Sequence, residues 1–331
     1  NNILNKLIEN NLAVSDWNKF TGIVEDLYSD LKINANGGHN ATYIPVLAEQ
    51  DPSWFGVSVC TVDGQRFDIG DVDVDFSIQS CVKPLMYAAA VEDVGLTEVH
   101  RHVGIEPSGL AFNEVSLNSD NLPHNPMINA GAIATGSCIR PGLDMAGRFK
   151  FFMEKVKALA GGERVGFSQP TYLCEHETAW RNNALLYYMQ EAGVFSKEVS
   201  PAAVLDFYIQ CCAIEVNSVS ASVIAATLAN GGVCPLNGEQ IVTPATVKSC
   251  LTLMFSCGMY DYSGEWCVQV GLPAKSGVAG LVYVVIPNVM GIAIFSPPLD
   301  SHGNSVKGVA FAEGLLRTYP FGIFDDFVNS L

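Results

Sequence analysis

Apolar residues recur every three to four positions in many segments of the chain, which is the period of an amphipathic helix. Several of these segments stop at glycine, for example at Gly161, Gly193 and Gly231, where a helix ends at little steric cost. The pattern predicts two helices within residues 1–32. It predicts further helices at residues 148–160, 180–192, 201–215, 218–229, 244–256 and 306–318.

Strand patterns lie towards the two ends of the chain. Residues 54–62 and 65–69 flank Asp63-Gly64, a two-residue turn signal, so they predict a β-hairpin. Other strands are predicted at residues 268–271, 277–286 and 289–296, with the last two joined at Pro287-Asn288, while residues 96–140 are predicted to be rich in loops. We therefore expect an α+β fold. One mixed sheet would be built from both chain ends and flanked by helices, with a helical subdomain between them.

The segment between the hairpin and the helical middle carries candidate chemistry. Ser80 and Lys83 stand at a strand-to-helix junction, and positions i and i+3 share one face of a helix. A serine hydroxyl becomes a good nucleophile only when a base removes its proton. A lysine can be that base only when its amine is neutral, which requires a pKa far below the ordinary value of ~10.4. The apolar residues 85–91 would bury the lysine stem and lower the pKa of its amine.

A second motif indicates a function for the Ser80–Lys83 pair. Ser29 and Lys32 have the same spacing, but they lie in a polar stretch that predicts a solvated helix end. Lys275-Ser276-Gly277 instead precedes the apolar run 281–286. Ser-x-x-Lys together with Lys-Ser-Gly is typical of serine β-lactamases and penicillin-binding proteins, in which the second motif borders the cleft containing the serine. The two motifs predict a serine-dependent enzyme of that fold.

Composition limits the partners. The 331 residues carry a formal net charge of −16, which argues against nucleic acid and anionic membranes as ligands. No apolar run approaches the roughly 18 residues of a membrane span. His176-Glu177 begins like a zinc motif, but Trp180 stands where the second histidine would be, so we predict no metal site and no cofactor.

The cysteines and the first residues bear on location. Most of the ten cysteines lie in apolar runs and are interpreted as reduced packing residues of an intracellular protein. The chain begins at Asn1 without a methionine or a signal-peptide pattern, which we interpret as a trimmed start that lacks any native targeting segment. The cysteines in question are Cys60, Cys81, Cys138, Cys211, Cys212 and Cys250.

Further segments join the two motifs over residues 38–320: Tyr43-Ile44-Pro45, Glu106-Pro107-Ser108-Gly109, Arg181-Asn182, Asp206-Phe207-Tyr208, and residues 56–64, 123–132, 258–261, 271–280 and 296–300. With these segments the chain resembles the serine-dependent glutaminases, a family with the β-lactamase fold, and is closer to the animal kidney- and liver-type enzymes than to short bacterial ones. The resemblance implies that residues 1–34 end an N-terminal helical region, residues 35–320 form the catalytic domain, and residues 321–331 are a C-terminal tail.

The resemblance also implies a reaction and a site. The reaction is hydrolysis of L-glutamine to L-glutamate and ammonia, with Ser80 as nucleophile, Lys83 as its activator and Tyr260 as a second proton-transfer group. The backbone N–H groups of Ser80 and Val278 would form the oxyanion hole. The residues implied to hold the substrate are Tyr43, Asn129, Glu175, Asn182, Tyr208 and Val278.

Several alternatives stay open from the sequence. The chain could be a glutaminase, a β-lactam-reactive acyl enzyme on the same fold, or a catalytically silent binding or assembly module. The resting base could be a neutral Lys83 or a deprotonated Tyr260. Ser119-Asp120-Asn121 matches the Ser-Asp-Asn motif of class A β-lactamases, whereas the resemblance assigns that work to Asn129.

The resemblance finally implies a homodimer or homotetramer, phosphate as an activator, and a mitochondrial location in a eukaryote or a cytoplasmic one otherwise. This chain departs from the family pattern in the loop formed by residues 112–118. Animal glutaminases carry an aromatic residue where this chain has Ser116, in a loop that contributes to dimer–dimer contacts and phosphate-linked activation. Ser116 therefore predicts weaker apolar association.

Overall fold

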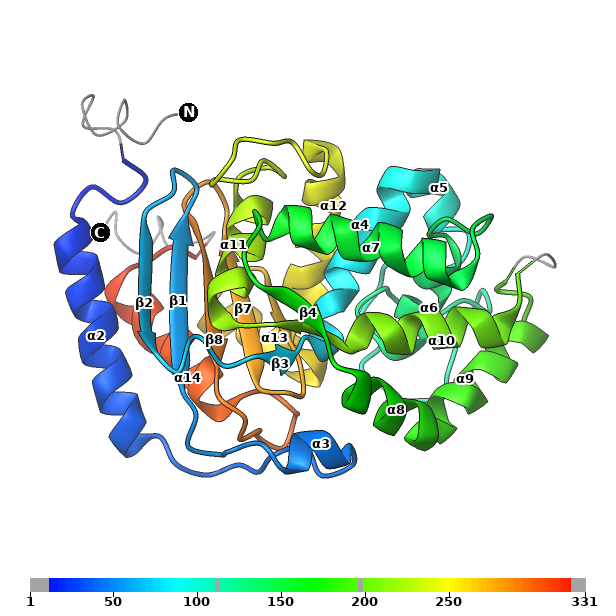
Figure 1. Cartoon of the computed structure of the whole chain (residues 1–331), viewed down its shortest axis with the longest axis horizontal. Coiled ribbons are helices and arrows are strands. Elements are labelled where there is room, and N and C mark those ends of the chain that lie inside the picture. Colours follow the sequence, from blue (N-terminus) through cyan, green and yellow to red (C-terminus); the bar gives the residue numbers. More distant parts are fainter. Residues whose placement is uncertain (1–11, 111–113, 196–198, 323–331) are drawn as a thin grey trace.

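A five-stranded sheet lies at the centre of one half of the molecule (Figure 1). The computed structural model describes residues 12–110, 114–195 and 199–322. The sheet is built from both ends of the chain, as predicted, but all of its pairings are antiparallel rather than mixed. Its order is β2 (Arg66–Gly70), β1 (Gly56–Thr61), β8 (Met290–Phe295), β7 (Leu281–Ile286) and β6 (Ala274–Ser276).

The turns of this sheet follow the sequence signals at two places. The predicted hairpin is confirmed, because β1 and β2 pair from Gly56 with Gly70 to Cys60 with Arg66. Strands β7 and β8 meet at Asn288, which has a positive φ of 64°. The strand predicted at residues 268–271 is wrong, since those residues end helix α13 (Ser263–Gln269) and lead to β6. Residues 277–280 form the turn between β6 and β7 rather than a strand.

Helices cover both faces of the sheet. Helix α11 (Ser218–Ala229) lies on one face, and α2 (Trp17–Asn34) and α14 (Val306–Thr318) lie together on the other (Figure 1). A side chain at Gly291 of β8 would lie 2.2 Å from the backbone nitrogen of Ala226, so glycine lets α11 lie directly against the strand. The predicted helices at residues 218–229 and 306–318 are confirmed. The first helix expected within residues 1–32 falls almost entirely outside the described residues.

The second half of the molecule is helical, as the sequence predicts, and packs beside the sheet (Figure 1). A three-stranded sheet with the order β3 (Phe76–Ser77), β5 (Ile214–Val216), β4 (Val165–Phe167) joins the two halves. The helix predicted at residues 201–215 ends at Cys212, because β5 follows. The helices of this half are α4 (Lys83–Val94), α5 (Leu96–Val99), α6 (Asn129–Ser137), α7 (Met145–Leu159), α8 (Gln169–Thr178), α9 (Trp180–Glu191), α10 (Pro201–Cys212) and α12 (Pro244–Cys257).

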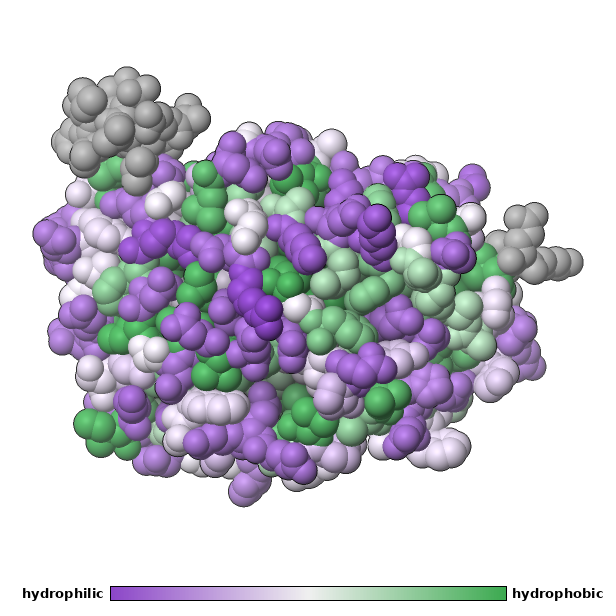
Figure 2. Space-filling view, in the orientation of Figure 1, coloured by the Kyte–Doolittle hydropathy of each residue, from purple (hydrophilic) through white to green (hydrophobic). Residues whose placement is uncertain are grey.

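The polar surface and the buried free cysteines match the expectations from the composition. Hydrophilic residues cover much of the face shown in Figure 2, with hydrophobic residues scattered among them. Within the described residues, each helix is too short or too polar to cross a membrane. All ten cysteines are free thiols, and the six that were predicted to pack in the interior are buried.

Candidate active site

Ser80 lies where β3 gives way to helix. A short 3₁₀ turn, Gln79–Val82, follows the strand and continues into α4. Gln79 has a positive φ of 51°, a conformation that is uncommon for any residue except glycine. This turn places the buried Ser80 at the N-terminal end of α4, where the helix dipole favours negative charge.

Lys83 faces Ser80 from the first turn of α4. Its Nζ lies 2.5 Å from Ser80 Oγ and donates to Asn129 Oδ1 at 2.9 Å. The side chain is fully buried and forms no ion pair with any described carboxylate. Burial lowers the pKa of the Lys83 amine to about 8. At pH 7 about a tenth of the amine is therefore neutral, against a negligible share at its ordinary pKa, and this neutral form can accept the serine proton.

Asn129 connects Lys83 to the residues predicted to bind substrate. It begins α6, and its Oδ1 accepts a second hydrogen bond, from the hydroxyl of Tyr208 at 3.2 Å. Its Nδ2 donates to Asn182 Oδ1 at 3.1 Å. Because one amide contacts the amine, the phenol and a second amide, a shift of Asn129 would disturb both the base and the binding groups.

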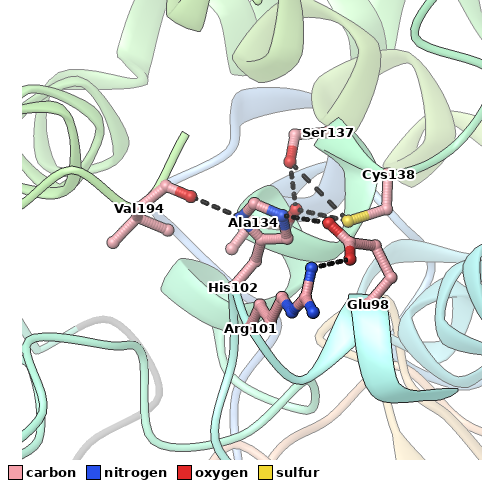
Figure 3. Close-up of polar contacts among 7 residues, drawn as sticks. All are labelled: Glu98, Arg101, His102, Ala134, Ser137, Cys138 and Val194. Carbon is pink, nitrogen blue, oxygen red and sulfur yellow. Dashed lines mark hydrogen bonds and ion pairs between the residues drawn. The ribbon is translucent and has the colours of Figure 1, made fainter. Parts of the chain in front are cut away.

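The other end of α6 is held by further polar contacts. The hydroxyl of Ser137 donates to the carbonyl three residues earlier at 2.6 Å, and Arg148 donates to the carbonyl of Gly136 at 2.6 Å. Figure 3 shows Glu98 and His102 beside this end of the helix, where His102 Nδ1 donates to a backbone carbonyl of the segment after α9 at 2.6 Å. Of these contacts, the one from Arg148 on α7 joins the far end of the helix that carries Asn129 to another element.

Tyr260 approaches Ser80 from the turn before α13. Its φ is 57°, and its hydroxyl donates to the carbonyl of Ser276 at 3.1 Å. Burial raises the pKa of this phenol well above its ordinary value, although a hydrogen bond with Ser80 opposes the shift. Lys275 Nζ lies 4.6 Å from the centre of the Tyr260 ring, and burial and the charge of Lys83 lower its pKa to about 7. Tyr260 therefore stays protonated at rest, and the geometry favours Lys83 as the resting base.

The predicted oxyanion hole consists of two backbone amides, those of Ser80 and Val278. A Cβ at Gly277 would lie 3.0 Å from the carbonyl oxygen of Ile78 and 3.1 Å from Cys81 Sγ, so glycine lets the end of β6 approach the turn that holds Ser80 without a tight contact. Val278 follows directly. The amides of Ser80 and Val278 donate no hydrogen bond to any residue that the structure describes.

The predicted binding residues line one cleft, of about 130 Å³, beside Ser80. Glu175 comes from α8, and its Oε2 is buried without a hydrogen-bond partner among the described residues. Burial raises the pKa of this carboxyl to about 8, while Gln79 and Lys83 oppose the shift. Lys83 and Tyr260 do not line the cleft, but each forms a hydrogen bond with Ser80. The cleft contains Tyr43, Ser80, Asn129, Glu175, Asn182, Tyr208 and Val278.

The cleft also contains residues that the sequence did not assign. Gln79 lines it beside Ser80 and donates to Ser77 Oγ at 3.0 Å. Its place directly before the nucleophile was the available signal. Arg181 adds a cation to the lining, and Cys212 adds a thiol whose pKa burial raises to about 12.

Comparisons with known proteins agree with this geometry. A glutaminase family model matches residues 38–324. The mitochondrial liver isoform of glutaminase from Rattus norvegicus is 46% identical over 324 residues, which are 98% of this chain and 54% of the rat protein. This chain therefore spans about half the length of that relative.

Solved structures share the fold. The probable glutaminase ybaS has a TM-score of 0.89 and 36% identity, over 93% of this chain and 99% of that one. Mglu in its glutamate form has a TM-score of 0.84 and 37% identity, over 93% of this chain and 69% of that one. The predicted α+β, β-lactamase-like fold class is confirmed. On sequence and structure alike, the chain belongs to the glutaminase family.

Proposed function

We propose that this chain hydrolyses L-glutamine to L-glutamate and ammonia through an acyl-enzyme formed on Ser80. The observation that carries the proposal is the 2.5 Å separation of Lys83 Nζ and Ser80 Oγ in a site where burial lowers the pKa of the lysine. Membership of the glutaminase family supports the reaction. The similarity to Mglu in its glutamate form supports glutamate as the product.

Acylation uses the side chains already in contact. Neutral Lys83 takes the hydroxyl proton of Ser80, and Oγ attacks the side-chain carbonyl carbon of glutamine. The resulting oxyanion is bound by the amides of Ser80 and Val278, and a preorganised donor of this kind contributes about 3–4 kcal/mol. The C–N bond then breaks as the leaving nitrogen receives the proton that Lys83 took from Ser80, either directly or through Tyr260, which passes on its own proton and regains one from Lys83, so Lys83 is neutral again.

Deacylation repeats the same chemistry with water. A water molecule attacks the ester carbon while Lys83 accepts its proton, and the bond between the carbon and Ser80 Oγ breaks as the proton returns to the serine. The buried side chains supply all the acid and base groups, so the proposed reaction needs no cofactor.

Recognition of glutamine rests on groups at the far side of the cleft. The α-ammonium of the substrate would lie against Glu175, whose buried Oε2 awaits a donor. The α-carboxylate would be bound by the hydroxyl of Tyr43 and the amide of Asn182, with Arg181 as the nearby cation. A cleft that uses several polar groups rejects analogues lacking one of them, because a buried partner is then left unpaired.

Assembly, regulation and location follow from family membership as proposals. We infer a homodimer or homotetramer, with phosphate as an activator. The rat relative is named as mitochondrial, which supports a mitochondrial location if this chain comes from a eukaryote and a cytoplasmic one otherwise.

The test is ammonia release from L-glutamine, run beside hydrolysis of a chromogenic β-lactam. A glutaminase releases ammonia and leaves the β-lactam intact. Turnover of the β-lactam alone would support the alternative of a β-lactam-reactive acyl enzyme. Turnover of neither compound would support the alternative of a catalytically silent binding or assembly module.

A further inference from the structure

A second, larger cavity adjoins the substrate cleft. It has a volume of about 520 Å³ and is formed by residues 38–43, Val278 and residues 299–303. We call it the outer cavity. Tyr43 and Val278 line both the outer cavity and the substrate cleft, so the two spaces meet at these side chains.

The outer cavity borders two groups that the proposed reaction uses, the backbone amide of Val278 and, through Gly303, the ring of Tyr260. Val278 supplies one of the two oxyanion amides, and Gly303 in the wall packs against Tyr260, whose ring carbon would lie 3.6 Å from a Cβ at that glycine. In the tetrahedral intermediate, the carbon carries Ser80 Oγ, the oxyanion, the glutamyl chain and the leaving nitrogen. The amides take the oxyanion and the cleft takes the chain. The leaving nitrogen therefore lies on the remaining side, next to Tyr260 and the outer cavity.

The walls of this cavity are well ordered by backbone contacts. His39 and Leu299 exchange backbone hydrogen bonds of 3.1 and 2.9 Å. Asp300 Oδ1 accepts from the backbone nitrogens of His302 at 2.8 Å and of Asn304 at 3.0 Å, which fixes the loop. The cavity is therefore a built feature of this face.

The charges of the wall select among substituents. Asp300 is the only carboxylate in the described lining of the outer cavity, no lysine or arginine lines it, and the two imidazoles are those of His39 and His302. Asn40 also lines it, and its Oδ1 has no hydrogen-bond partner among the described residues. A carboxylate and an amide oxygen favour a hydrogen-bond donor such as an amide or amine, and they disfavour an anion.

We propose that the enzyme also hydrolyses γ-glutamyl amides whose amide nitrogen carries a small neutral or cationic substituent, which binds in the outer cavity. This inference rests on the proposed function and extends its substrate class. The step is balanced as for glutamine. The C–N bond of the substituted amide breaks, Ser80 Oγ keeps the glutamyl group, and the amine leaves with the proton that Lys83 took from Ser80, passed directly or through Tyr260.

The probe is γ-glutamylglycinamide, and γ-glutamylglycine is its anionic counterpart. Glutamate release by mass spectrometry gives kcat/KM for both, beside L-glutamine. We expect saturable hydrolysis of γ-glutamylglycinamide. Its kcat/KM should be at least about tenfold higher than that of γ-glutamylglycine, because the terminal carboxylate of γ-glutamylglycine would face the carboxylate of Asp300. Asp300→Asn removes the charge but keeps a side-chain oxygen that can accept the backbone hydrogen bonds of the loop. We expect this variant to reduce the ratio of the two kcat/KM values severalfold.

The matched variants are Ser301→Trp, which fills the outer cavity, and Ser119→Trp, an exposed serine that lines neither space. We expect Ser301→Trp to lower kcat/KM for γ-glutamylglycinamide about tenfold or more while glutamine hydrolysis changes less than about twofold, because a bulky ring excludes the substituent. Ser119→Trp should change neither rate.

Two results would overturn the inference alone: glutamine hydrolysis without cleavage of γ-glutamylglycinamide, or an equal effect of Ser301→Trp on both substrates. If the wild-type protein hydrolyses no glutamine, the proposed function fails first and the inference fails with it. Glutamine turnover in each variant also reports that the variant is folded.

Discussion

The amine of Lys83 lies 2.5 Å from the hydroxyl oxygen of Ser80, and neither group is exposed to solvent to any useful extent. A buried amine without an anionic partner is stabilised in its neutral form, because desolvation disfavours the charge. In the proposed function the pair is a nucleophile and its base, and the first turn of one helix holds them together. The predictions below follow from this relationship and from the groups around it.

Replacement of the nucleophile should abolish turnover. We expect Ser80→Ala to lower glutamine hydrolysis by several orders of magnitude, because the acyl-enzyme cannot form, while the protein remains folded. Ammonia release and circular dichroism measure the two properties. Substantial turnover in a folded Ser80→Ala protein would exclude Ser80 as the nucleophile.

A glutamine analogue with an electrophilic carbon at its side-chain end should label Ser80. The competing nucleophile is Cys212, which lines the same cleft, but a pKa raised to about 12 keeps its thiol protonated. Peptide mapping by mass spectrometry locates the adduct, and Cys212→Ser serves as the control. An adduct on Cys212 in the wild-type protein would contradict the prediction.

Activity should rise with pH around the pKa of Lys83. Below about 8 most of the amine is protonated and cannot accept the serine proton, whereas above about 8 it is neutral and active. The kcat/KM of the wild-type protein, which reports groups of the free enzyme, should therefore increase from mildly acidic to alkaline pH with a midpoint near that value. Lys83→Arg should be nearly inactive throughout, since a guanidinium stays charged. A steady fall above neutral pH in folded protein would assign the base elsewhere.

Substrate binding should release a proton from Glu175. Burial raises the pKa of its carboxyl to about 8, so in the empty cleft at pH 7 it is mainly protonated. A bound ammonium favours the carboxylate and lowers that pKa, so up to about one proton leaves on binding. Titration calorimetry of Ser80→Ala with L-glutamine, in buffers of different ionisation enthalpy, measures this number. Glu175→Gln should bind more weakly and release none. Equal release by that variant would trace the proton to another group.

The contact between Ser80 and Lys83 could be predicted from the sequence, because the two residues are three positions apart and need only local helix geometry to meet. The same holds for α11, whose glycine end at Gly231 and apolar run are local signals. Asn129 and Glu175 are different. Their positions depend on contacts between distant segments, and only the family resemblance pointed to them.

Three elements were missed for physical reasons. Helix α6 is buried along its whole length and contains two glycines, so it shows no apolar stripe. Helix α8 buries only Thr171 and is otherwise polar, which hides its period. The alternation at residues 268–271 indicated a strand, yet Val268 is 83% exposed at the end of α13. In each case the burial of the side chains does not follow the periodicity of the local sequence.

The last prediction concerns assembly, and it depends on the loop that contains Ser116. Phe112 and Asn113 lie outside the described residues. Ser116 is half-buried between Val115, which is exposed, and Leu117, so an apolar residue here would extend an existing apolar strip. We expect Ser116→Phe to promote higher assembly and to reduce any dependence on phosphate.

The size of this effect follows from the area that the ring buries. Complete burial of a phenylalanine side chain contributes roughly 1.5–3 kcal/mol. The change enters twice at a two-fold contact, and each 1.4 kcal/mol is about tenfold in association. Sedimentation velocity across concentration, with and without phosphate, measures the shift, and Ser119→Phe, directly after this loop, is the control. Because Ser80 and Lys83 lie elsewhere, turnover per site should change less than assembly. Identical oligomer distributions for the wild type and Ser116→Phe would show that this loop does not govern assembly.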